Sequence, residues 1–177
     1  RSIYENYKGK IIIKHINNIT SSEICANLLK YDSIHGNFSS LVKSGGNYIK
    51  INKEKISYTQ HSMINDIKWK KYGVDYVFEC TGKFNSRDQL LSHIENGVKK
   101  VIVSAPCKMA DKTIVFGVNH KEINKNDRII SAASCTTNCL APVADVINKN
   151  FIILNGFMTT IHAFTSDQRI LDNSHKD

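Results

Sequence analysis

The sequence predicts an α/β fold, a doubly wound parallel sheet that leads into the start of an α+β domain. Short apolar runs rich in β-branched residues recur over roughly the first 130 residues, and capped helical segments separate several of them. This alternation is typical of βαβ units and a parallel sheet. The length of 177 residues is enough for one good core and part of a second.

The first expected elements lie before residue 60. The run 10–16 is apolar and β-branched, which predicts a buried parallel strand ended by Asn17 and Asn18. Thr20 or Ser21 caps an expected helix that continues through Leu29. Gly45-Gly46 predicts a hairpin turn, and the alternation over 47–52 and 55–59 predicts antiparallel strands.

The second set of expected elements runs from residue 75 to residue 130. Ser86 and Gln89 have the spacing of a capping box, which predicts a helix through Ile94 that Gly97 ends. The strands expected around this helix are 75–80, 101–104, 113–116 and 128–130.

One stretch, Ile129 to Pro142, takes an apolar strand through a polar turn into a helix. Ser134 is a favourable N-cap, which places Cys135 and Thr136 in the first helical turn. Unpaired N–H groups and the helix dipole give that turn a positive potential, so a thiol there is biased toward the thiolate. Cys135 is therefore a candidate nucleophile, provided that a base lies near it.

The candidate base is His162, which follows the apolar run 155–161. We expect a strand there with His162 at its end, where strand ends of α/β proteins open into a ligand crevice. A buried cysteine and a histidine with ordinary structural partners are a more common reading of such a pair, and spacing alone does not decide.

The literal residues favour the catalytic reading. The stretch Ser-Ala-Ala-Ser-Cys-Thr-Thr-Asn-Cys-Leu-Ala-Pro, then Met-Thr-Thr-Ile-His-Ala and Ser-His-Lys-Asp, resembles bacterial-type phosphorylating glyceraldehyde-3-phosphate dehydrogenase. Four further matches stand in the family's order, at 28–36, 79–84, 104–106 and 117–120. The resemblance covers essentially the whole chain.

The resemblance implies a Rossmann-type dinucleotide-binding domain, of which residues 1–134 are part, and the beginning of a catalytic domain at 135–177. It also implies NAD as cofactor and a homotetramer. The family's glycine-rich phosphate loop would precede residue 1, and the rest of its catalytic domain would follow residue 177. We therefore expect the chain to be a fragment or the ordered part of a longer protein, and expect the 177 residues alone to be inactive.

The cofactor residues are implied by position. Asn17 and Asn18 align with the ribose site, where relatives usually carry Asp at position 18; the missing charge should weaken discrimination against NADP. Ser62 stands where relatives often place an arginine against adenine. Four other positions belong to the implied crevice. Thr81 and Gly82 line it, Phe84 abuts adenine or is ordinary core, and Ser104 approaches the nicotinamide.

The reaction implied is oxidation of glyceraldehyde 3-phosphate to 1,3-bisphosphoglycerate through a Cys135 thioester, with His162 as acid and base and inorganic phosphate as second substrate. Ser134 and Thr136 belong to the attacking-phosphate pocket, beside a helix N-terminus that favours anions. Thr165 and Asp167 match the substrate-phosphate region, Asp167 by orienting an arginine. Ala132 replaces a usual Asn.

Composition limits the alternatives. The net charge is +8, but the lysines are spread without interleaved aromatic residues, so no specific nucleic acid is expected. Five cysteines without zinc-ligand spacing predict reduced thiols, no metal and a cytoplasmic protein, and no apolar run is long enough for a membrane span. Erythrose-4-phosphate dehydrogenase, a non-catalytic basic RNA- or surface-binding role and a redox sensor using Cys135 remain as alternatives.

Overall fold

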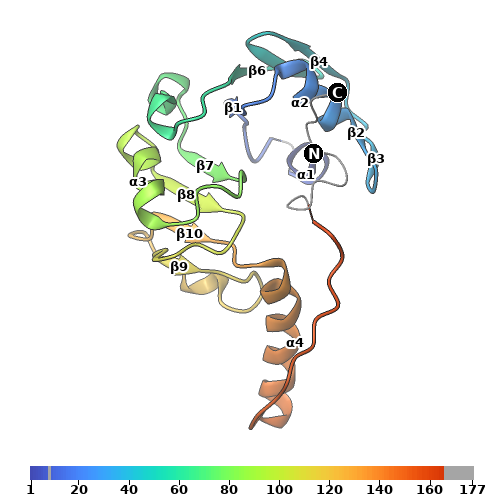
Figure 1. Cartoon of the computed structure of the whole chain (residues 1–177), viewed down its shortest axis with the longest axis vertical. Coiled ribbons are helices and arrows are strands. Elements are labelled where there is room, and N and C mark those ends of the chain that lie inside the picture. The colour runs from blue at the N-terminus through green and yellow to red at the C-terminus, as the bar shows by residue number, and fades with distance from the viewer. Residues whose placement is uncertain (8, 166–177) are drawn as a thin grey trace. The chain divides into compact units, whose positions relative to one another are not determined.

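The computed structural model describes residues 1–7 and 9–165, which form two compact units: 1–73 with 162–165, and Val74–Ile161. Figure 1 shows the elements along the chain. The helices are α1 (Ser2–Asn6), α2 (Ser22–Lys30), α3 (Arg87–Glu95) and α4 (Cys135–Phe151), with 3-10 turns η1 (Ile64–Asp66), η2 (Trp69–Tyr72) and η3 (His120–Glu122). The units are described separately.

The first unit is built on a four-stranded sheet of order β1-β6-β5-β4, which comprises β1 (His15–Asn17), β6 (Glu54–Thr59), β5 (Tyr48–Ile51) and β4 (Val42–Gly45). β1 runs parallel to β6, and the other pairs are antiparallel. Ile49, Ile51 and Ile56 form its core with Ala26 of α2. A two-stranded ribbon pairs β2 (Tyr31–Asp32) with β3 (Gly36–Asn37). The predicted hairpin at Gly45-Gly46 is confirmed.

The first predicted strand is too long. The strand covers His15–Asn17 only, and Ile11 and Ile12 are exposed. The pairing with β6 begins only at His15, opposite Ser57, although β6 itself starts at Glu54, so the residues before His15 make no ladder bonds with it. Apolar, β-branched composition alone therefore did not define the strand.

The second unit contains a fully parallel sheet of order β7-β8-β10-β9. Its strands are β7 (Tyr76–Glu79), β8 (Lys100–Val103), β10 (Ile129–Ser131) and β9 (Lys112–Thr113). α3 connects β7 to β8 and contributes the fully buried Leu90 to the core, and every residue of β10 is buried. The predicted α/β class with a parallel sheet is confirmed. The strand predicted at 113–116 is shorter and lies earlier in the chain, since β9 covers Lys112–Thr113 only.

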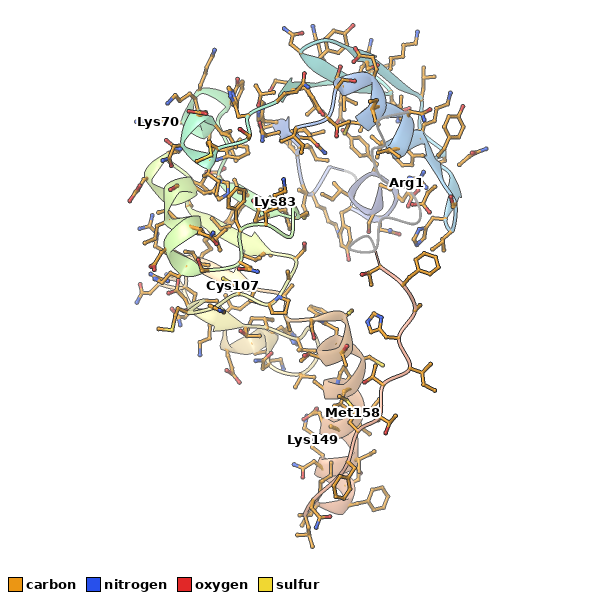
Figure 2. All side chains as sticks on the ribbon, in the orientation of Figure 1. Arg1, Lys70, Lys83, Cys107, Lys149 and Met158 are labelled. Carbon is orange, nitrogen blue, oxygen red and sulfur yellow. The ribbon has the colours of Figure 1, made fainter. Side chains whose placement is uncertain are left out.

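Helix α4 follows β10 and leaves the sheet (Figure 2). None of its residues is buried. Residues 152–165 have neither helix nor strand, so the expected strand ending at His162 is not there. No strand among the described residues pairs with this segment, and an extended chain without a partner gains no ladder hydrogen bonds.

Two further findings concern the whole described chain. Across residues 1–7 and 9–165, no helix combines the length and the apolar character that crossing a membrane requires. The division into domains at residues 134 and 135 stays a prediction, because the compact units divide elsewhere, at Gly73 and Val74.

Candidate functional site

The parallel sheet of the second unit brings several predicted site residues to one edge. Strands β7, β8 and β10 all end there, and these ends are where open α/β sheets bind ligands. The edge is held by backbone bonds from Ser104 N to the Glu79 carbonyl, 3.0 Å, and from Ala132 N to the Val103 carbonyl, 2.8 Å. Three predicted segments therefore lie at this edge: Thr81–Gly82, Ser104 and 134–136.

Cys135 opens helix α4 and its side chain is exposed. The predicted cap is confirmed: Ser134 Oγ accepts the Thr137 N–H at 3.0 Å. Asn138 Nδ2 donates to the carbonyls of Ala132, 2.7 Å, and Ser134, 2.9 Å, which ties the helix to the turn before it. An exposed thiol in the first turn of a capped helix has the setting of a reactive cysteine.

The turn into α4 is unusual at Ala133. Its φ is +61°, in the left-handed region that L residues with a Cβ rarely adopt, and the residue is buried. Ser131 Oγ accepts the Ala133 N–H at 3.1 Å and donates to the Ala105 carbonyl at 2.8 Å. These bonds fix the reversal that carries the chain from the buried strand to the exposed thiol.

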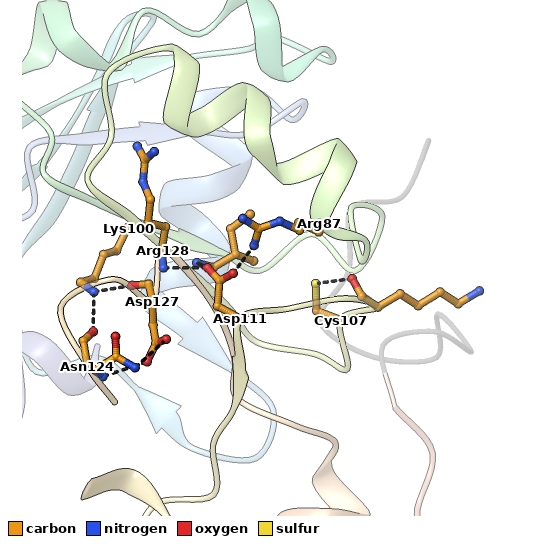
Figure 3. A network of polar contacts seen from close by, with 9 residues as sticks. Arg87, Lys100, Cys107, Asp111, Asn124, Asp127 and Arg128 are labelled. Carbon is orange, nitrogen blue, oxygen red and sulfur yellow. Dashed lines mark hydrogen bonds and ion pairs between the residues drawn. The ribbon is translucent and has the colours of Figure 1, made fainter. Parts of the chain in front are cut away.

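The start of β10 is fixed by Asp111 (Figure 3). Its Oδ2 accepts the backbone N–H groups of Arg128 and Ile129, each at 2.8 Å, while Oδ1 pairs with Arg87 of α3. Burial raises the pKa of the Asp111 carboxyl, but these backbone bonds and Arg87 outweigh it and hold the pKa below its ordinary value. The strand that delivers Cys135 is thereby anchored at its amino end.

A buried carboxylate stands directly under the Thr81 turn. Glu79 Oε1 accepts the Thr81 N–H, 2.8 Å, and the Thr81 hydroxyl, 2.5 Å, and Oε2 lies 3.4 Å from His93 Nε2 of α3. Burial raises the pKa of Glu79, but the hydrogen bonds with His93 and Thr81 outweigh it and lower the pKa overall. Neither Glu79 nor His93 is among the site residues predicted from the sequence. The sequence feature that could have indicated Glu79 is an acidic residue at the end of an apolar strand.

A cavity of about 350 Å³ lies beside the N-terminal turn of α4. Its walls include Pro106 and Cys107 from the segment after β8, Thr113 of β9, and Ser134 and Thr137 at the start of α4. Burial raises the pKa of the Cys107 thiol. Cys135 is not among the lining residues. No cluster of three or more side chains suited to a metal ion occurs among residues 1–7 and 9–165.

The predicted ribose residues belong to the first unit. Asn17 has its amide engaged on one side with 59–61: Oδ1 accepts the Thr59 hydroxyl and the His61 N–H, both at 2.9 Å, and Nδ2 donates to the His61 carbonyl. Asn18 is exposed, and its Oδ1 accepts the Thr20 N–H at 3.0 Å. Ser62 is exposed as well. Of the three, Asn17 is the one whose side chain chiefly supports the fold locally.

The remaining predicted residues are placed as follows. His162 and Thr165 are exposed and belong to the first unit, whereas Cys135 belongs to the second, so their meeting stays a prediction. Phe84 is half-buried, as is Thr136. Asp167 lies outside the described residues.

Comparison with known proteins identifies the family. Residues 1–87 match the family model "Glyceraldehyde 3-phosphate dehydrogenase, NAD binding domain", and residues 134–177 match "Glyceraldehyde 3-phosphate dehydrogenase, C-terminal domain". The chain belongs to the glyceraldehyde-3-phosphate dehydrogenase family. The resemblance stated from the cysteine motif is thus confirmed, as is NAD as the cofactor, since the match over residues 1–87 is to an NAD-binding domain.

Several bacterial relatives carry the name glyceraldehyde-3-phosphate dehydrogenase. The protein of Cereibacter sphaeroides is 45% identical over 177 residues, which is 100% of this chain and 53% of the relative. That of Zymomonas mobilis is 47% identical over 178 residues, with the same shares, and that of Mycoplasma pneumoniae 46% identical over 168 residues, 94% of this chain and 50% of the relative. The chain spans about half the length of the curated relatives it matches.

Proposed function

We propose that the protein to which this chain belongs oxidises glyceraldehyde 3-phosphate to 1,3-bisphosphoglycerate, with NAD as the oxidant and inorganic phosphate as the second substrate. The observation that carries the proposal is the position of Cys135. It is an exposed thiol in the first turn of a capped helix, at the carboxyl edge of a parallel sheet, in a chain of this family. That is the environment in which a cysteine acts as a nucleophile.

The proposed chemistry divides among few groups. The Cys135 thiolate attacks the aldehyde carbon, and a C–S bond forms as the carbonyl becomes an oxyanion that the N–H groups of the α4 first turn can stabilise. NAD, when bound, accepts the hydride that leaves this carbon. The Cys135 thioester that remains is cleaved by phosphate, which takes the acyl group and returns the thiolate. His162 is the proposed base for the thiol proton and the acid at the oxyanion.

Two anion sites complete the proposal. Ser134 and Thr136 flank the N-terminus of α4, where the dipole favours the attacking phosphate. The Ser134 hydroxyl oxygen already bonds the Thr137 N–H and hydroxyl. For Ser134 to bind phosphate, its hydroxyl hydrogen must point to a phosphate oxygen instead of to Thr137. Thr165 and Asp167 are proposed for the phosphate of the substrate, Asp167 by orienting an arginine, because a carboxylate repels phosphate.

The residues at the sheet edge fit a dinucleotide. Gly82 has φ +71° and a Cβ built on it would meet no atom within 4 Å, so the turn after β7 leaves open space at the strand end. Thr81 and Ser104 are exposed at that edge, with half-buried Phe84 following the turn. We propose these residues, with Asn17, Asn18 and Ser62 of the first unit, as the NAD contacts. A cytoplasmic homotetramer is part of the same proposal.

The family matches do not favour the alternatives. Relatives matching 95–100% of the chain are named for the glyceraldehyde enzyme, rather than for the erythrose 4-phosphate enzyme or an RNA- or surface-binding role. Oxidation of Cys135 is compatible with catalysis, because an exposed thiolate is also oxidisable.

The deciding experiment replaces each of two cysteines of α4 by serine in separate variants. In the full polypeptide that carries this sequence, Cys135→Ser should abolish NADH formation, by about 1,000-fold or more, while NAD binding persists. Cys139→Ser is the matched control, since Cys139 is also exposed and lies one turn further along α4. It should keep activity near that of the unmutated protein. Substantial turnover in the Cys135→Ser protein would refute the proposed nucleophile.

A further inference from the structure

Two buried ionisable groups of the second unit have no role in the proposed chemistry. Glu79 is the last residue of β7 and is 6% exposed, and His93 on α3 is 1% exposed. Burying a carboxylate is costly unless hydrogen bonds replace its water. Both Glu79 oxygens have such partners, and two of these partner groups come from a single exposed residue, Thr81, in the turn at the ligand edge.

These contacts determine how the Thr81 hydroxyl is oriented. The ionised carboxylate of Glu79 can only accept, so the hydroxyl hydrogen of Thr81 points inward toward Oε1. The hydroxyl oxygen also accepts the Lys83 N–H at 3.1 Å, which closes the turn around Gly82. One lone pair of that oxygen remains for an outside partner, and such a partner must be a hydrogen-bond donor.

We propose that Glu79, whose Oε2 is contacted by His93 Nε2, is a positioning residue for the cofactor. It fixes the Thr81–Gly82 turn so that Thr81 offers an acceptor to a hydroxyl or amide donor of the dinucleotide. His93 acts through Glu79, because its Nε2 faces Oε2 and leaves Oε1 for the two Thr81 donors. This inference rests on the proposed function, since it assigns NAD to the edge where Thr81 lies.

The test compares two buried carboxylates. Asp127 is also 6% exposed, but it holds Asn124 N, 2.8 Å, and Asn124 Nδ2, 3.0 Å, at the opposite, amino end of β10 (Figure 3). In the full polypeptide, Glu79→Leu should raise the Kd for NAD, measured by titration calorimetry, about tenfold or more. Asp127→Leu should leave the Kd within about twofold of the unmutated protein, because it does not touch the ligand edge.

A conservative variant separates positioning from general damage. In Glu79→Gln the amide oxygen still accepts from Thr81 while the amide NH₂ faces the His93 ring, so the Kd should return to within about threefold of the unmutated value. Hydrogen exchange without NAD gives a second readout. The Thr81 and Lys83 amides should exchange faster in Glu79→Leu and not in Asp127→Leu or Glu79→Gln.

If Glu79→Leu does not fold, variants of the exposed Thr81 take its place in the test. Thr81→Ala should raise the Kd for NAD and speed exchange of the Lys83 amide, and Thr81→Ser should do neither. Equal NAD affinity in Glu79→Leu and Asp127→Leu would overturn the inference alone. Equal affinity in the two Thr81 variants would overturn the inference and would also remove Thr81 from the proposed NAD contacts. An unmutated protein that does not bind NAD would instead refute the proposed function, and with it the inference that rests on it.

Discussion

The parallel sheet of the second unit and helix α4 both carry many apolar residues, yet most of those in the sheet are buried and none of those in α4 is. Val101, Val103 and Ile129 of the sheet are at most 1% exposed, whereas Val146 and Phe151 of α4 are 61% and 81% exposed. The sheet strands pair with one another and lie under α3. Helix α4 has no buried residue at all among those described.

The difference shows that an apolar pattern selects a face but does not bury it. Burial needs a second surface. The strands find it within residues 76–131, and α4 does not find it in residues 1–7 and 9–165. The proposed nucleophile lies at the boundary of the two regions. The sheet should therefore provide most of the stability, and α4 should respond mainly to its own local bonds.

The largest expected effect comes from truncating the sheet core. Ile129→Ala removes a fully buried side chain from β10 and should lower the free energy of unfolding by about 2–5 kcal/mol. Val146→Ala on α4 should change it by no more than about 0.5 kcal/mol, since that side chain is 61% exposed. Urea unfolding of the two variants measures both values. A loss in Val146→Ala comparable to that in Ile129→Ala would mean that α4 has a packing partner after all.

A smaller effect is expected at the anchor of β10. Asp111→Asn loses the charge that faces Arg87 and replaces one carboxylate oxygen with an NH₂ group, so either Arg87 or the two backbone N–H groups lose their acceptor. The unfolding free energy at pH 7 should fall by about 2 kcal/mol. The control is Asp145→Asn on α4, which loses only a surface pair with Lys149 and should cost at most about 0.5 kcal/mol.

The same variant has a pH signature. Because folding lowers the Asp111 pKa below 3.8, its carboxylate stabilises the fold above that pH, and this contribution is lost as the pH falls through the folded pKa. Unfolding curves of the unmutated protein and Asp111→Asn, measured between about pH 5 and pH 2, should therefore converge toward the acid end. Curves that stay parallel would show that the charge contributes nothing to β10.

The smallest expected effect concerns the cap of α4. Ser134→Ala removes the acceptor for the Thr137 N–H, which should cost about 1 kcal/mol and speed exchange of that amide about fivefold, while β10 amides keep their rates. Ser86→Ala is the control, because Ser86 is the N-cap of α3 but its hydroxyl donates to Gln89 and caps no backbone N–H. Amide exchange followed by NMR distinguishes them. Equal effects of the two variants would argue against a specific cap at Cys135.

Predictions succeeded where the signal was local. The Ser134 cap, the Gly45-Gly46 turn and the strand before Thr81 all depend on residues within a few positions of one another, and the structure has them. The capping box of α3 was only partly right: the Gln89 side chain reaches back, but to the N–H of Asn85. The predicted strand at 155–161 is wrong. Its apolar residues indicated burial, but no strand among the described residues pairs with this segment.

The sequence by itself determined the family, the α/β class and the exposed cysteine at the start of a capped helix, because motifs, caps and turns depend on residues that lie close together in the sequence. Only the tertiary structure decided that Glu79 lies between Thr81 and His93, and that Asp111 holds the start of β10 with Arg87. His93 lies 14 positions from Glu79, and Arg87 lies 24 positions from Asp111, so the fold of the parallel sheet and α3 must bring these partners together. No local pattern specifies which buried charge meets which donor, since that depends on strand order and register.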